Sequence, residues 1–162
     1  MRRLISAKQG GFDDIVFLCI GTDRATGDAL GPLVGYLLAD SDATVYGNLQ
    51  KPIHATNLLR SLEEIKLRHK NPLIVAIDAC LGNTSRIGKL IVKEGGIAPA
   101  MAIAEIAESL PKVGDISIAG VVNVSAEASG QCPLAVLSST RLGLVVQMAE
   151  VVAAGITKGF GN

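Results

Sequence analysis

The sequence predicts an α/β fold in which a mostly parallel sheet is sandwiched between helices. Two continuous apolar runs, Ile15–Ile20 and Leu73–Ile77, have the length of strands and are typical of strands covered on both faces. Segments with helical spacing of apolar residues alternate with the strand-like runs along the whole chain. Because alternating strands and helices form βαβ units, the strands are expected to be parallel or mostly parallel.

The elements follow in order from these patterns. A helix is predicted over 28–38, where leucines and Val34 recur at helical spacing, and a second from Asn57, with Asn71 and Pro72 as its stop. The longest helix is predicted over 138–158, where one face is apolar throughout. The remaining expected elements are strands at 44–49, 88–93 and 115–124, and an Ala-rich helix at about 99–110.

Composition points to one domain spanning residues 1–162. The chain is 49% hydrophobic, and its 15 basic residues balance 15 acidic ones, which disfavours nucleic acid and anionic membranes as partners. Three cysteines, an odd number, indicate reduced thiols of a cytosolic protein. Neither a signal-peptide core nor a convincing membrane span is expected, and no oligomeric state follows from the sequence.

The turn after the first strand carries the main chemical signal. It lacks the glycine patterns of a phosphate-binding loop and offers two carboxylates, Asp23 and Asp28. A third carboxylate, Asp78, directly follows the apolar run 73–77. Carboxylates at the ends of neighbouring strands suit a cation, a water to be activated or a general base.

Polar residues on the other strand-end loops are expected to join this edge. His54 and Asn57 follow the second strand, and Asn123 lies at the end of the strand at 115–124. With Asp23, they are predicted to contact substrate. Each residue also has a structural interpretation that the sequence leaves open, since Asp28 could cap its helix, Asp78 could close a turn or cap a helix, and His54 could bond to its own loop.

Other candidate groups favour structural roles. Cys80 has no visible partner except His54, so a buried structural thiol is preferred over a nucleophile. The run 138–140 indicates a helix start, because no Gly-x-Ser-x-Gly elbow surrounds it. His69 lies between Arg68 and Lys70 and is expected on a solvated face.

Several segments resemble one known family. They are Ile-Gly-Thr-Asp-Arg-Ala-Thr-Gly-Asp-Ala-Leu-Gly-Pro at 20–32, Lys-Pro-Ile-His-Ala-Thr-Asn-Leu at 51–58, Ala-Ile-Asp-Ala-Cys-Leu-Gly at 76–82, Leu-Pro-Lys-Val-Gly-Asp-Ile-Ser-Ile-Ala-Gly-Val-Val-Asn at 110–123 and Thr-Arg-Leu at 140–142. Together they resemble the YyaC-type sporulation proteins of spore-forming bacteria. That family is similar to the spore germination protease and, more distantly, to the hydrogenase maturation endopeptidases.

The resemblance implies a three-layer αβα sandwich of the phosphorylase/hydrolase-like, hydrogenase maturation protease-like type. It also implies peptide-bond cleavage by two acidic residues, which fall on Asp28 and Asp78. The hydrogenase endopeptidases add a His and hold nickel, whereas the germination protease uses no dedicated metal. Because this chain has no His in 111–127 and His54 is on a different loop, no metal and no cofactor are expected.

The sequence-based hypothesis is therefore a sporulation-associated peptidase, resembling the germination protease, that acts on a protein or peptide. The resemblance places it in the cytoplasm of the forespore or mother cell. Two alternatives remain: a non-enzymatic sporulation or regulatory factor that uses the protease scaffold for binding, and a small-molecule amidase with the same carboxylates.

Overall fold

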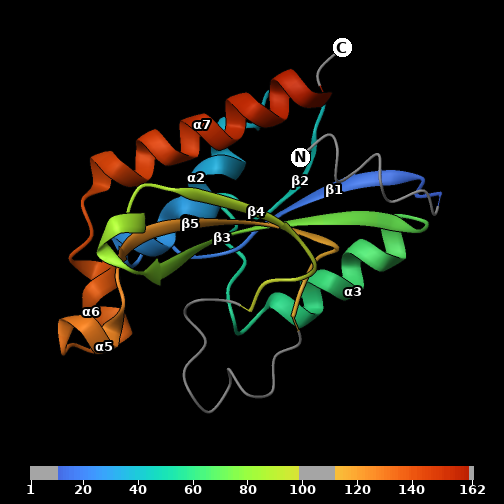
Figure 1. Ribbon diagram of the computed structural model, residues 1–162. Coiled ribbons are helices and arrows are strands. Elements are labelled where there is room, and N and C mark those ends of the chain that lie inside the picture. Colours follow the sequence, from blue (N-terminus) through green and yellow to red (C-terminus); the bar gives the residue numbers. More distant parts are fainter. Residues whose placement is uncertain (1–10, 99–111, 161–162) are drawn as a thin grey trace.

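The computed structural model describes residues 11–98 and 112–160 and contains one five-stranded sheet (Figure 1). In spatial order the strands are β2 (Thr44–Tyr46), β1 (Asp14–Cys19), β3 (Pro72–Gly82), β5 (Ile116–Val124) and β4 (Leu90–Glu94). All neighbouring pairs are parallel except β4 and β5, which are antiparallel. The mostly parallel sheet predicted from the sequence is thus confirmed.

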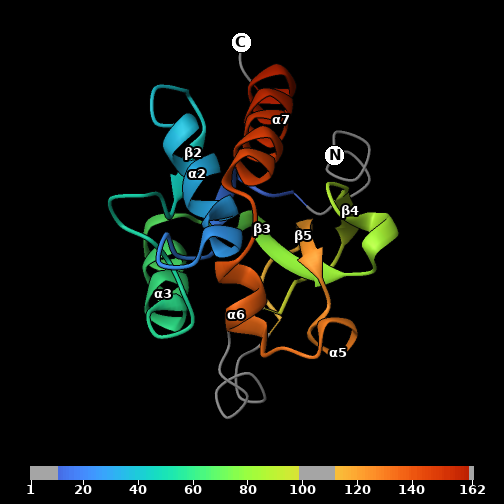
Figure 2. The same cartoon turned by 90° about the vertical axis from the view of Figure 1, so that its left-hand side faces the viewer.

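Helices cover both faces of the sheet, so the fold has three layers (Figures 1 and 2). Helices α2 (Leu30–Leu37) and α7 (Leu142–Phe160) lie on one face, and α3 (Leu58–Arg68) lies on the other. The short helices α5 (Ala126–Ser129) and α6 (Pro133–Ser138) lie at the carboxyl ends of β3 and β5. Two 3₁₀ turns complete the described elements, η1 (Thr26–Ala29) and η2 (Thr84–Arg86).

Side chains of the central strands point alternately to the two faces of the sheet and fill two separate cores. On β1, Phe17 and Cys19 face the core beneath α2 and α7, whereas Val16 and Leu18 face the core beneath α3. Every one of these side chains is buried. A strand that packs on both faces must be apolar at every position, which explains the unbroken apolar runs in the sequence.

Helix α7 has a length and composition that would also suit a membrane span. Its buried side chains, however, form one face that packs into the core beneath α2 and α7; they are Val145, Met148, Ala149, Val152, Ala153 and Ile156. Packing against the sheet therefore accounts for the apolarity of α7.

Three elements differ from the sequence-based prediction by more than two residues at one end. Strand β3 continues five residues past Ile77 to Gly82, because β5 pairs with it as far as Val124. The helix predicted to begin at Ser138 is two helices, since α6 ends at that residue and α7 begins at Leu142. Strand β2 stops at Tyr46. The helix predicted at about 99–110 lies outside the described residues.

Candidate active site

The turn that leaves β1 closes on Asp28. The Thr22 N–H lies 3.1 Å from the backbone oxygen of Asp28 and 2.8 Å from its Oδ2. Gly21 has φ +133°, and a Cβ at this position would lie 2.0 Å from the Asp28 carbonyl oxygen. Only glycine fits such an approach, so the glycine and the carboxylate of the sequence motif form one structural unit.

The Asp28 carboxylate is buried and only partly satisfied. Its residue is 1% exposed, and among the described residues Oδ1 has no hydrogen-bond partner. Burial raises the Asp28 pKa from 3.8 to about 6, against the opposing effect of the Thr22 N–H. Neither η1 nor α2 receives a side-chain cap bond, so the structure contradicts the helix-cap interpretation of this residue.

Asp78 lies within β3, just past the end of β1. Cys19, the last residue of β1, pairs with Ile77, so Asp78 is the first β3 residue beyond its neighbour. The side chain is completely buried, and Oδ1 accepts the Ala79 N–H at 2.8 Å. Because β3 runs on for four residues with a bulge after Cys80, Asp78 neither ends a strand nor caps a helix.

Helix α6 supports the turn that carries Asp28. A Cβ on Gly27 would lie 2.8 Å from Thr140 Oγ1 and 2.8 Å from Leu137, so η1 rests directly on the end of α6. The Asn123 amide fixes this end to β5, because Nδ2 donates to Thr140 Oγ1 and to the Val136 carbonyl, each at 3.1 Å. The sequence analysis assigned Thr140 only to a helix start and did not single out Leu137. Pro133, in the first turn of α6, was the available signal for this helix.

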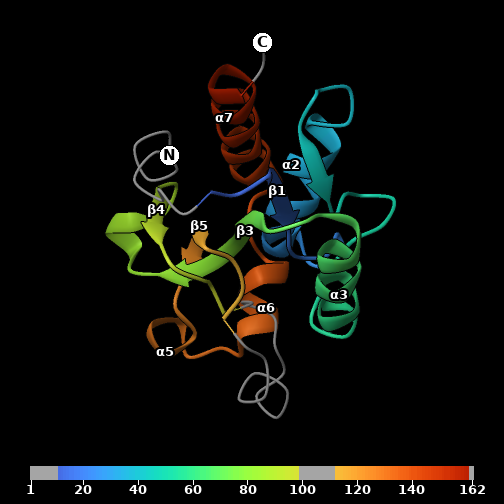
Figure 3. The same cartoon turned by 90° about the vertical axis from the view of Figure 1, so that its right-hand side faces the viewer.

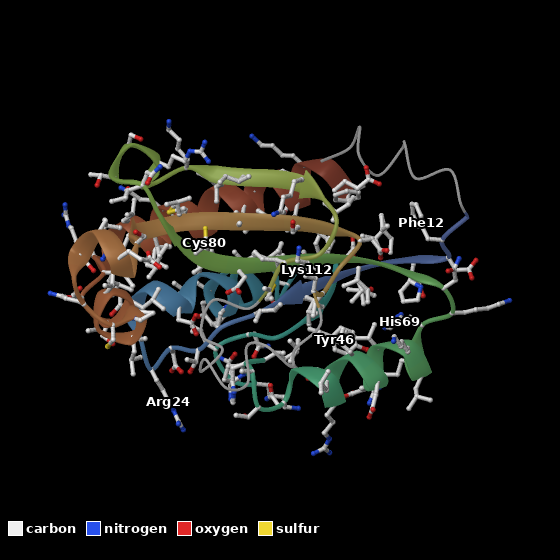
Figure 4. The ribbon with its side chains drawn as sticks, turned by 60° about the horizontal axis from the view of Figure 1, so that its bottom comes forward. Phe12, Arg24, Tyr46, His69, Cys80 and Lys112 are labelled. Carbon is white, nitrogen blue, oxygen red and sulfur yellow. The ribbon has the colours of Figure 1, made fainter. Side chains whose placement is uncertain are left out.

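His54 and Asn57 line a groove of about 550 Å³ between the end of β2 and α3. Both side chains bond within their own loop: His54 Nδ1 lies 3.0 Å from Thr56 Oγ1, and the Asn57 amide accepts the His54 N–H and donates to the Pro52 carbonyl. Asp23 is exposed on the turn beside Arg24, which points away from the body of the protein (Figure 4). That these residues, with Asn123, contact substrate stays a prediction.

The cysteines do not supply an activated nucleophile. Burial raises the Cys19 pKa to about 12, and burial together with the charge of Asp78 raises the Cys80 pKa. A raised pKa keeps a thiol protonated and weakly nucleophilic at neutral pH. Cys132 is exposed.

His69 is not on a solvated face, which corrects the sequence-based expectation. Its side chain is 16% exposed, with Nε2 lying 3.0 Å from the Tyr46 hydroxyl and Nδ1 lying 3.1 Å from Asp14 Oδ2. Tyr46 and His69 lie side by side between β2 and α3 (Figure 4). The helix ends at Arg68, and the turn that follows directs the ring back onto the sheet.

The donor set does not fit the nickel ion of the hydrogenase endopeptidases. Within residues 11–98 and 112–160, no three His, Cys, Asp or Glu side chains are grouped so as to hold an ion. The Nδ1 of His54 bonds to Thr56, and Asn123, near the end of β5, has its amide bonded to α6. Nickel and zinc prefer nitrogen or sulfur ligands, which this edge of the sheet does not assemble.

Comparisons with known proteins agree with this architecture. The family model described as "Protein of unknown function (DUF1256)" matches residues 1–155. The chain belongs to the DUF1256 family. It is 43% identical over 155 residues to the uncharacterized protein YyaC of Bacillus subtilis (strain 168), covering 94% of this chain and 72% of YyaC.

Solved structures show the same fold at low sequence identity. The [NiFe] hydrogenase maturation protease HycI from Thermococcus kodakarensis KOD1 superposes with a TM-score of 0.62 at 20% identity, covering 98% of this chain and 99% of HycI. An uncharacterized protein from Wolinella succinogenes superposes with a TM-score of 0.50 at 15% identity, covering 90% and 95%. This member of the DUF1256 family therefore has the hydrogenase maturation protease fold.

Proposed function

We propose that the chain is a peptidase that activates water with a carboxylate pair formed by Asp28 and Asp78. The observation that carries the proposal is the state of Asp28, a buried carboxylate with an oxygen that lacks a partner among the described residues and a pKa of about 6. A buried carboxylate with an unsatisfied oxygen lowers the stability of the fold, and residues that carry such a cost are concentrated at functional sites.

The environments of the two residues suggest different roles. Asp28, with its raised pKa, serves as the acid that donates a proton to the oxygen of the scissile carbonyl. Asp78, whose Oδ1 accepts a backbone N–H, serves as the base that takes a proton from water. The water oxygen attacks the carbonyl carbon to give a tetrahedral intermediate with two hydroxyl groups. When the C–N bond breaks, the proton held by Asp78 passes to the leaving amine and one hydroxyl proton returns to Asp28, which restores both residues.

Peptide cleavage is favoured over other hydrolyses by the fold shared with HycI, which is a maturation protease. The 43% identity to a B. subtilis protein supports the further proposal of a sporulation role in the cytoplasm of a spore former. A protein or peptide is the proposed partner, and the mechanism requires no metal or cofactor.

A non-enzymatic binding factor on the same scaffold is the second candidate. It is favoured by the residues predicted to contact substrate, because the Asn57 and Asn123 amides both bond within the protein and Asp23 is exposed to solvent. Such a factor would retain the two carboxylates without turnover.

Cleavage of a proteome-derived peptide library, followed by mass spectrometry of the new termini, separates the two candidates. The wild-type chain should generate termini that Asp28→Asn and Asp78→Asn do not, while the Asp23→Asn control on the same turn retains at least partial activity. Circular dichroism checks that each variant is folded. Identical termini from wild type and Asp78→Asn would remove Asp78 from the mechanism, and no termini from any variant would favour the binding factor.

A further inference from the structure

An edge strand with no described partner on its outer side, β4, lies at the opposite edge of the sheet from β2. In the part of the chain that the structure describes, β4 is the last strand of the sheet and pairs only with β5 (Figure 2). The Val121 N–H bonds to the Lys89 carbonyl and the Gly95 N–H bonds to the Asp115 carbonyl, so odd-numbered residues of this segment bond to β5. The N–H and C=O groups of Leu90 and Val92 therefore point outward, away from β5.

An apolar groove of about 410 Å³ runs beside this edge, between β4 and α7. Leu90, Val92 and Ile118 form its sheet side, and Val151 and Gly155 belong to its helix side. Val92 is 41% exposed and Val151 is 62% exposed. A Cβ added at Gly155 would contact nothing within 4 Å, so the groove is open above the helix.

The other face of β4 is positively charged. Side chains alternate along a strand, so Lys89 and Lys93 lie on the face opposite to Leu90 and Val92, and both are exposed. Lys93 is near enough to Cys80 to lower its pKa. Glu94 is the acidic residue of the strand and lies at its end, on the groove face.

We propose that β4 binds an extended peptide strand in which apolar and acidic side chains alternate. The outward groups of Leu90 and Val92 hydrogen-bond to the peptide backbone, the apolar side chains enter the groove, and the acidic side chains face Lys89 and Lys93. This is recognition by strand addition, in which the backbone supplies affinity and the alternate side chains supply specificity.

A second copy of the chain fits this edge poorly. In any antiparallel β4–β4 pairing that uses the outward groups, Lys93 of one copy lies opposite or diagonal to Lys89 or Lys93 of the other. Like charges at these positions destabilise strand pairs, and lysines are the residues with which natural edge strands prevent self-association. The same lysines attract an acidic strand.

Fluorescence anisotropy with a labelled, amidated Val-Glu-Val-Glu-Val-Glu-Val peptide tests the proposal. Binding should weaken with salt, and replacing Glu by Lys in the peptide or N-methylating alternate valines should reduce affinity by about tenfold or more. The Asp78→Asn variant should bind the peptide with wild-type affinity, because binding at β4 does not depend on the proposed hydrolysis.

Substitutions in the protein locate the site. Val92→Pro removes an outward N–H without breaking the ladder to β5, and Gly155→Leu fills the groove, so each should lower peptide affinity by about tenfold. Gly143→Leu is the matched control for Gly155→Leu, because Gly143 is also in α7 and has open space above it. The double variant Lys89→Glu/Lys93→Glu should have a lower affinity for the acidic peptide. Lys66→Glu on α3 is the charge control and should keep the wild-type affinity.

Equal affinity for wild type, Gly155→Leu and the double lysine variant would overturn the proposal, whether or not Val92→Pro folds. So would light scattering that shows a dimer broken by the peptide, since β4 would then be a self-association edge.

Discussion

Two polar clusters lie at opposite ends of β1, and they differ in how completely their groups are satisfied. At the start of the strand, Asp14 and Tyr46 bond to both ring nitrogens of His69 (Figure 4). Beyond its end, Asp28 is more deeply buried and keeps an oxygen without a partner among the described residues. The hydrogen bonds of the first cluster connect β1, β2 and the end of α3, and they stabilise the fold. The second carries an electrostatic cost, which is what the proposed catalytic role would require.

Viewed from the amino ends of the parallel strands, α7 and α3 lie on opposite sides of the sheet (Figure 3). Asp14 begins β1 and Asp28 follows its end, so the two clusters are separated along the chain direction of this strand. Substitutions at one end should therefore act independently of those at the other.

The largest expected effect is at the turn that leaves β1. Gly21→Ala places a Cβ 2.0 Å from the Asp28 carbonyl at a φ of +133°, so it should lower the free energy of unfolding by more than about 3 kcal/mol. Urea denaturation measures the loss. Gly143→Ala, where nothing lies within 4 Å, should leave stability unchanged or raise it by about 0.5–1 kcal/mol. Similar losses at both positions would mean that the turn does not close on Asp28.

Asp28→Asn should stabilise the protein at high pH. The folded-state pKa of about 6 lies above the ordinary 3.8, so ionising Asp28 costs stability as pH rises through this window and the full cost remains above it. Unfolding at pH 8 should give Asp28→Asn a gain of about 1–3 kcal/mol that disappears near pH 4. Asp23→Asn, an exposed control, should change little at either pH. A loss at pH 8 would show that the carboxylate is satisfied.

His69→Ala should lower the stability of the protein, in contrast to Asp28→Asn. Removing the ring leaves Tyr46 and Asp14 without their shared partner, so stability should fall by about 1–2 kcal/mol, and Tyr46→Phe should cost about 1 kcal/mol. Arg68→Ala removes an exposed ion pair with Glu64 and should cost no more than about 0.5 kcal/mol. If His69→Ala costs no more than Arg68→Ala, the cluster at the start of β1 is not a structural tie.

The sequence was sufficient to predict the mostly parallel sheet. The runs 15–20 and 73–77 are apolar at every position because both faces of β1 and β3 pack, and this signal is local. A carboxylate directly after such a run is buried by its neighbours, as Asp78 is.

What the sequence could not show depends on contacts between distant segments. The packing of Gly27 on Thr140 and the continuation of β3 past Ile77 both require neighbours that spacing does not reveal. His69 was misjudged for the same reason, since its sequence neighbours are charged while Tyr46, which covers it, is 23 residues away.

The most direct test of the carboxylate pair is an NMR titration of the Asp28 carboxyl carbon in the wild-type chain and in Asp78→Asn. A pair that shares a proton predicts an Asp28 pKa near 6 in the wild type and a lower value in Asp78→Asn, because one negative charge has been removed. An Asp28 pKa that is the same in both proteins would contradict the pair and the mechanism built on it, because burial alone would then set the value.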